Sequence, residues 1–177
     1  MSKAEKPSRG AAAKLDTPTD LSANAVGAIS AELNACLADT LSLYMKTKNF
    51  HWHVSGPHFR DYHLLLDEQS ADILASVDEL AERVRKIGGL TLRSIGQIAK
   101  LQRIADNDEE FVDAGAMLRE LMSDNKEMVK NLRKAHEVAD ENGDVGTASL
   151  LENFIDATEK RVWFLFEASR GVDGSGH

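Results

Sequence analysis

Two pairs of metal-ligating residue types, His63/Asp67 and Asp78/Glu82, fall within a single predicted helix. The members of each pair are four positions apart, so both side chains of a pair project from the same helical face. Asp78 follows Asp67 by eleven positions, close to three turns, and all four side chains therefore lie within a sector of roughly 100°. Imidazole nitrogen and carboxylate oxygen together suit iron, manganese or zinc, so the pattern indicates a metal site.

The two pairs are too far apart on one chain to enclose a single metal ion, because eleven positions correspond to a rise of about 16 Å. They are nevertheless mirror images about the point between Asp72 and Ile73. Two copies of the helix packed antiparallel across a two-fold axis at that point would bring the first pair of one copy opposite the second pair of the other. A two-fold interface is self-complementary in this way. The pattern therefore predicts a metal site shared between two identical subunits.

Two alternatives stay open on spacing alone. The same helix has enough carboxylates for an ordinary solvated acidic face, formed by Asp67, Glu68, Asp72, Asp78, Glu79 and Glu82. A further ligand is available from the end of the preceding helix, where His51 and His53 occur, but spacing does not choose between them. His58 lies among the four histidines near this helix, and His136 is predicted to lie on the surface or between helices.

Several other site classes are excluded by the sequence. Cys36 is the only cysteine, which rules out disulfide scaffolds and cysteine-based zinc sites, and its apolar surroundings predict a buried thiol. No histidine follows a glutamate at the Glu-x-x-His spacing of bundles with an internal di-iron site. His136-Glu137 lacks the second histidine of zinc proteases, and no phosphate-binding glycine loop occurs.

The elements that must position these residues are helices. With 177 residues and only 3 prolines, the chain predicts one all-α domain with a sizeable core. Apolar residues recur at three and four positions, as in amphipathic helices. Long helices are expected over about 21–53, 59–87, 108–140 and 145–170, and Thr91 to Leu101 forms a short helix in the middle connection. We expect the first helix to be capped by Thr17, Asp20 or Ser22 and the third by Asp106, Asn107 or Asp108. Four such helices predict a four-helix bundle over residues 21–171.

Charge divides the chain into a basic start and an acidic body. Residues 1–15 carry about +3 of a net charge of −8, so the remainder holds about −11. Residues 1–20 have no periodicity and predict a mobile basic arm, and residues 172–177 predict a frayed tail. No apolar stretch approaches the ~20 residues of a membrane span, and no signal-peptide core occurs, so a cytoplasmic location is expected.

Taken together, the residues resemble the Dps family, the DNA-binding proteins from starved cells. The resemblance covers about residues 20–170 and rests on Asn49-Phe50-His51-Trp52-His53, on Gly56, Phe59, His63, Asp67 and Asp78, and on Ala81-Glu82-Arg83. It implies a ferritin-like four-helix bundle with a short helix between the second and third long helices. It also implies twelve subunits in a hollow shell, with ferroxidase sites at the two-fold interfaces.

The resemblance assigns roles by position. It implies that His51, His63 and Asp67 of one subunit, with Asp78 and Glu82 of its partner, bind iron, and it thereby favours His51 over His53. Asp78 and Glu82 are the best bridging candidates. Zinc or manganese are possible substitutes for iron. Trp52 would lie beside the metal, either as a packed aromatic residue or as an electron donor that quenches oxidising by-products.

The function implied by the resemblance is iron storage and protection from oxidative stress, with Fe(II) oxidised preferably by hydrogen peroxide. Non-specific DNA binding through the basic arm is a second expectation. The alternative is a nucleoid-binding structural protein whose metal site is vestigial or holds zinc. Asp140, Glu141 and Asp144, near the last turn, could line an acidic entry pore, with a solvated loop as the other interpretation.

Overall fold

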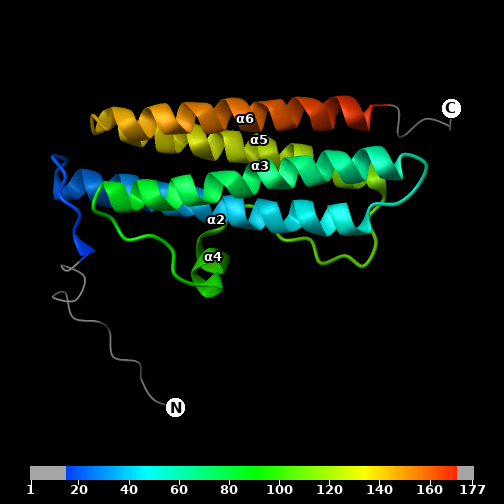
Figure 1. Cartoon of the computed structure of the whole chain (residues 1–177), viewed down its shortest axis with the longest axis horizontal. Coiled ribbons are helices and arrows are strands. Elements are labelled where there is room, and N and C mark those ends of the chain that lie inside the picture. The colour runs from blue at the N-terminus through cyan, green and yellow to red at the C-terminus, as the bar shows by residue number, and fades with distance from the viewer. Residues whose placement is uncertain (1–14, 171–177) are drawn as a thin grey trace, which may run out of the picture.

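Four long antiparallel helices form the body of the protein in a computed structural model that describes residues 15–170. They are α2 (Ala23–His53), α3 (Phe59–Lys86), α5 (Ala114–Glu141) and α6 (Val145–Ser169). A short helix, α4 (Ile95–Leu101), lies in the connection between α3 and α5. Figure 1 shows α2 and α3 as one layer, α5 and α6 as the other, and α4 outside the bundle beside α2. The predicted all-α four-helix bundle is confirmed.

The long connection between α3 and α5 determines how the helices pair. Tight turns make α2 antiparallel to α3 and α5 antiparallel to α6, whereas the α3–α5 connection returns along the bundle (Figure 1). Two contacts near the same end of the bundle establish this order. Lys46, near the end of α2, donates to Asp124 near the start of α5 at 2.7 Å. Tyr62, at the start of α3, donates to the carbonyl of Ala168 at the end of α6 at 3.2 Å.

Helix boundaries agree with the sequence except at the starts of α4 and α5. The short helix α4 begins at Ile95, four residues later than predicted, with Ser94 as its cap. Ser22 caps α2, accepting from the backbone of Ala25 at 3.2 Å, as one of the three predicted caps. The prediction for α5 was wrong, because its cap is Asp113 and not a residue of 106–108. There the Asn107 side chain accepts from the backbone of Glu109 at 3.0 Å, which holds the chain in a turn.

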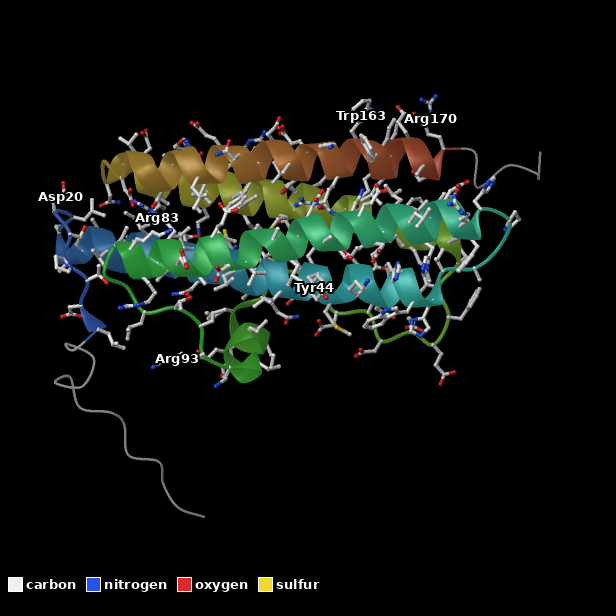
Figure 2. The ribbon with its side chains drawn as sticks, in the orientation of Figure 1. Asp20, Tyr44, Arg83, Arg93, Trp163 and Arg170 are labelled. Atoms are coloured by element: carbon white, nitrogen blue, oxygen red, sulfur yellow. The ribbon has the colours of Figure 1, made fainter. Side chains whose placement is uncertain are left out.

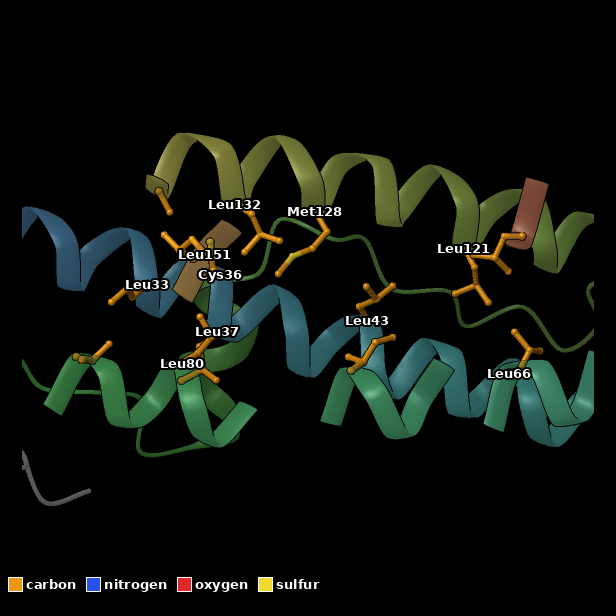
Figure 3. Packing of buried hydrophobic residues seen from close by; sticks show 14 of the residues in the cluster. Leu33, Cys36, Leu37, Leu43, Leu66, Leu80, Leu121, Met128, Leu132 and Leu151 are labelled. Carbon is orange, nitrogen blue, oxygen red and sulfur yellow. The ribbon is translucent and has the colours of Figure 1, made fainter. Parts of the chain in front are cut away.

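The core lies along the full length of the bundle and is built mostly from leucine. Figure 3 shows leucines of α2, α3 and α5 interdigitating around Met128, with Cys36 among them. Cys36 is fully buried, as predicted, and burial raises the pKa of its thiol to about 11. A thiol of this kind stays protonated at neutral pH and is chemically inert.

The end of α6 carries large apolar side chains outside the core. The Phe166 side chain is 47% exposed and lies against the Arg170 guanidinium. Its neighbour Trp163 is also exposed and projects from the outer side of α6 in Figure 2. The last two turns of α6 therefore carry aromatic residues on more sides than the core of one chain can cover.

The predicted terminal segments are only partly described. Residues 1–14 of the expected arm and 171–177, which include the expected frayed tail, lie outside the described residues. The end of the arm is described and contacts α3: the Leu15 carbonyl accepts from the Arg85 guanidinium. Within residues 15–170, no helix has both the length and the apolar character needed to cross a membrane.

Two glycines end α3 where the sequence predicts a stop. Gly88 has a φ of 91°, a conformation that side chains with a Cβ rarely adopt. Gly89 is needed for a different reason: a Cβ built on it would lie 2.1 Å from Ser30 Oγ on α2 and 2.9 Å from Val84 Cγ1. The missing side chain at Gly89 therefore allows the end of α3 to approach α2 closely.

We expect Gly89→Ala to lower the free energy of unfolding by about 1–3 kcal/mol, because the new methyl group overlaps Ser30 and Val84. Gly27→Ala is the matched control. Gly27 lies inside α2 with no atom within 4 Å of a built Cβ, so alanine there should stabilise the helix by about 0.5–1 kcal/mol. Thermal denaturation of both variants measures the difference, and equal effects would contradict the close approach at Gly89.

Candidate metal centre

His51 and His63 face each other where the end of α2 meets the start of α3. The His51 Nδ1 atom lies 2.8 Å from the His63 carbonyl oxygen, and the His63 Nδ1 atom lies 2.9 Å from the His51 carbonyl oxygen. The two rings stack with centroids 3.8 Å apart. Phe50 precedes His51 in α2, and Leu66 follows His63 by three residues in α3. Both are buried core residues, so the helices that carry the two histidines are packed together at this point.

These hydrogen bonds determine which ring nitrogens are free. A backbone carbonyl can only accept, so each neutral ring must carry its proton on Nδ1. Both Nε2 atoms then keep a lone pair. Metal-ligating histidines are commonly held in this way, with one ring nitrogen donating to a carbonyl and the other bound to the ion. The two side chains therefore fit a metal ion before any ion is present.

Asp67 provides a carboxylate beside the histidines, one turn along α3. Its Oδ1 atom lies 3.7 Å from His51 Nε2. The same oxygen accepts a hydrogen bond from the Lys48 ammonium at 2.8 Å. This hydrogen bond and the charge of Lys48 lower the pKa of Asp67 below its ordinary value. Asp67 is thus ionised at neutral pH. Its carboxylate, a candidate metal ligand, binds the Lys48 ammonium.

Asp78 and Glu82 lie on the same helix but apart from this cluster. Both are exposed, and Glu82 forms an ion pair with Lys86 at 3.1 Å. Because α3 is an unbroken helix, the rise of about 16 Å between Asp67 and Asp78 is retained. Within the described residues, no three histidine, cysteine or acidic side chains converge enough to hold a metal ion.

The other sequence candidates lie outside the His51–His63 pair. His53 is exposed, with Nδ1 2.8 Å from the Asn49 carbonyl of its own helix. His58 precedes α3 and its ring is tilted against Tyr62 at 5.6 Å. Trp52 follows His51 in the chain and is 56% exposed.

Two residues near the histidines were missed by sequence reasoning as members of the site. One is Lys48, whose position one turn before His51 on the same helix was the available signal. The other is Phe59, whose ring lies 5.0 Å from that of His63. Phe59 is one of the residues on which the family resemblance rests, but no role in the metal site was predicted for it.

The pore hypothesis does not hold for Asp144. Its carboxylate is buried, forms an ion pair with Arg83 and caps the start of α6 by accepting from Thr147. Asp140 and Glu141 are exposed at the end of α5. Asp144 therefore joins α3 to α6 and does not present its charge to solvent.

Comparisons with known proteins agree on one family. The ferritin-like domain family matches residues 30–169. A DNA protection during starvation protein from Brevibacillus brevis is 34% identical over 134 residues, which cover 75% of this chain and 89% of that protein. The Dps structure from Thermosynechococcus elongatus superposes with a TM-score of 0.82 and 28% identity, covering 87% of this chain and 98% of that one. The Dps structure from Vibrio cholerae O1, described as a ferritin-like diiron-carboxylate protein, gives a TM-score of 0.79 at 28% identity, covering 84% and 92%.

We expect neutral His51 and His63 to carry their protons on Nδ1, because both Nδ1 atoms face carbonyl oxygens. Solid-state ¹⁵N spectra of the sedimented, metal-free protein measure this, with signals assigned from His51→Ala and His63→Ala. His136 is the internal control: its Nε2 atom faces the Glu152 carboxylate at 3.3 Å, so it should show the opposite tautomer. Protons on Nε2 of His51 and His63 would contradict the ligand geometry.

Proposed function

Because this chain belongs to the Dps group of the ferritin-like family, we propose that it oxidises Fe(II) at sites shared between two subunits. The ferric product is then stored inside a hollow homo-oligomeric shell, which we expect to contain twelve subunits. The observation that carries this proposal is the reciprocal pairing of His51 and His63. It leaves two free Nε2 atoms beside an ionised Asp67, which is a ligand set for Fe(II) that lacks the rest of its coordination sphere.

The missing ligands come from a second copy packed antiparallel along α3. On the face that carries His63 and Asp67, the structure leaves Leu64 and Leu74 40% and 46% exposed. Reflection about the point between residues 72 and 73 brings each leucine to the level of a small residue, Leu64 to Ala81 and Leu74 to Ala71. Large side chains opposite small ones allow two helices to approach closely. This match supports a two-fold axis between residues 72 and 73.

Each such axis produces two identical iron sites. In each site His51, His63 and Asp67 of one subunit lie opposite Asp78 and Glu82 of the other. Neutral imidazole suits Fe(II), while carboxylates favour the harder ferric product and are able to bridge two ions. Lys48 keeps Asp67 ionised until iron arrives, and the incoming cation displaces the Lys48 ammonium from Oδ1. Zinc or manganese would occupy the same ligands as substitutes.

The reaction is a two-electron reduction of peroxide by two ferrous ions. Each Fe(II) gives one electron, the O–O bond breaks, and both peroxide oxygens leave as water or hydroxide. Pairing the electrons avoids the one-electron step that releases hydroxyl radical. Trp52, exposed next to His51, is placed to donate an electron to oxidising by-products near the site.

We expect two variants, His51/His63→Ala and Asp78/Glu82→Ala, to lose peroxide-dependent Fe(II) oxidation when each is assembled alone. Coassembly of the two chains should restore part of the activity, because a mixed dimer contains one whole site and one site that lacks all four changed ligands. Stopped-flow absorbance of ferric product measures the rate. His136→Ala, which changes a histidine paired with Glu152 elsewhere, should oxidise iron as fast as the wild type.

Mixing must be verified by mass spectrometry of chains with different tags. Verified mixed assemblies without any recovered activity would exclude the shared site. Full activity of either variant alone would exclude the ligand assignment itself. A wild-type protein that binds zinc tightly and oxidises no iron would instead favour a structural, nucleoid-binding role.

Non-specific DNA binding through the start of the chain is the second part of the proposal. Residues 1–14 contain four cationic residues, Lys3, Lys6, Arg9 and Lys14, and one acidic residue, Glu5. Many copies on one particle multiply weak phosphate contacts. The proposal is supported by this charge and by relatives named for DNA protection.

We expect deletion of residues 1–14 to reduce DNA retention in gel shifts at least about tenfold at low salt, since the arm supplies the cations that release counterions from DNA. A second variant keeps the arm length but replaces its four cations with glutamine, and it should behave like the deletion. Binding by wild-type protein should fall steeply as salt rises. Undiminished retention by both variants would exclude the arm as the DNA contact.

A further inference from the structure

A cavity of about 460 Å³ lies midway along the bundle, between α3 and α6, on a different side of α3 from the iron ligands. Its lining includes core residues of α2, α3 and α5, among them Leu43, Leu80, Met128 and Leu132, which are labelled in Figure 3. Its rim carries the exposed side chains of Asp72, Glu79, Asp156 and Lys160. The side chains of Asp72 and Asp67 are about 140° apart around α3, so the cavity is separate from the metal centre.

Arg161 lines this cavity, and neutral groups bind its guanidinium. Its side chain is 9% exposed, and its hydrogen bonds go to neutral acceptors: Nε donates to Asn125 Oδ1 at 2.9 Å and Nη2 to Thr158 Oγ1 at 2.7 Å. No carboxylate of the described residues lies within 4 Å of its guanidinium. Two other arginines differ in this respect, because Arg83 pairs with Asp144 and Arg103 with Asp39.

A buried charge without a counter-ion is costly. Burial lowers the pKa of Arg161 to about 10, and the charge of Asp72 only partly opposes this effect. The guanidinium is nevertheless held firmly, since the buried Asn125 that orients it is itself anchored by donating to the Leu121 carbonyl at 2.8 Å. A rigid, desolvated guanidinium with unused N–H groups at the edge of a cavity is a strong donor for an anion.

We propose that this cavity is a binding site for a small oxyanion of the phosphate type, with Arg161 as its charged ligand. The planar guanidinium presents paired donors that match two oxygens of such an anion. Lys160 at the rim adds a second positive charge, and Asn153 and Ser76 add neutral polar groups. The carboxylates of Asp72, Glu79 and Asp156 at the rim oppose anion binding, so the buried Arg161 must supply most of the attraction.

Isothermal titration of the full-length protein with inorganic phosphate tests this proposal. The protein is treated with chelator so that iron cannot take up the phosphate. We expect saturable binding, which Arg161→Met weakens at least about tenfold because the charge-assisted hydrogen bonds are lost. Arg161→Lys, which keeps the charge and loses the fork, should bind with intermediate affinity. Asp72→Asn should bind phosphate at least as tightly as the wild type, because a repelling charge at the rim is removed.

The controls separate this site from others on the same protein. Arg133→Met removes an exposed arginine paired with Glu159 and should leave phosphate binding unchanged. His63→Ala should also bind phosphate normally, so that loss of the iron site and loss of the anion site are distinguishable. Absence of saturable binding to the wild type would overturn the proposal. So would unchanged binding in Arg161→Met or, if that variant does not fold, unchanged binding in Arg161→Lys. Acetate bound as tightly as phosphate would overturn the preference for tetrahedral anions.

Discussion

The unbroken course of α3 constrains everything that the candidate site is able to do. A helix of 28 residues keeps a constant rise, so His63 and Asp67 at one end stay about 16 Å from Asp78 and Glu82 further along. No rearrangement of side chains closes that distance within one chain. In the proposed function, the helix carries two incomplete sites, and antiparallel packing of a second copy would complete each of them. Iron oxidation would then require assembly, because the ligands of one chain are too far apart.

Ion pairs between the helices and their connections hold the bundle together. Arg83 at the end of α3 pairs with Asp144, and the buried Asp39 of α2 binds Arg103 after α4. Lys46 joins α2 to Glu120 and Asp124 of α5. Loss of one partner from such a buried pair costs about 3–5 kcal/mol, because the other charge is left without compensation. These ion pairs determine which helices lie next to one another more strictly than the leucine core does, because leucine side chains would pack in many helix arrangements.

Sequence reasoning worked best where local chemistry determines the structure. The Ser22 cap and the ends of the helices predicted over about 21–53 and 59–87 lie where they were predicted, since each depends on backbone chemistry over a few residues. It failed where a distant partner decides. Asp144 was expected to line an acidic pore or to lie in a solvated loop, because its partner Arg83 is far away in sequence. The start of α5 was placed too early because Asn107, a good cap in isolation, also donates to Glu120 of α5 at 2.8 Å and stays in the loop.

The sequence by itself determined the ligand types, their spacing and the mirror relation along α3, because a helix converts spacing directly into direction and rise. Only the tertiary structure decided which atoms of the half-site are available. The crossing of α2 and α3 turns each histidine Nδ1 onto the other's carbonyl and frees Nε2, and it brings Lys48 onto Asp67. Likewise, the packing of α6 against α3 and α5 left Arg161 buried without a carboxylate. Such contacts join residues distant in the chain, so no local pattern encodes them.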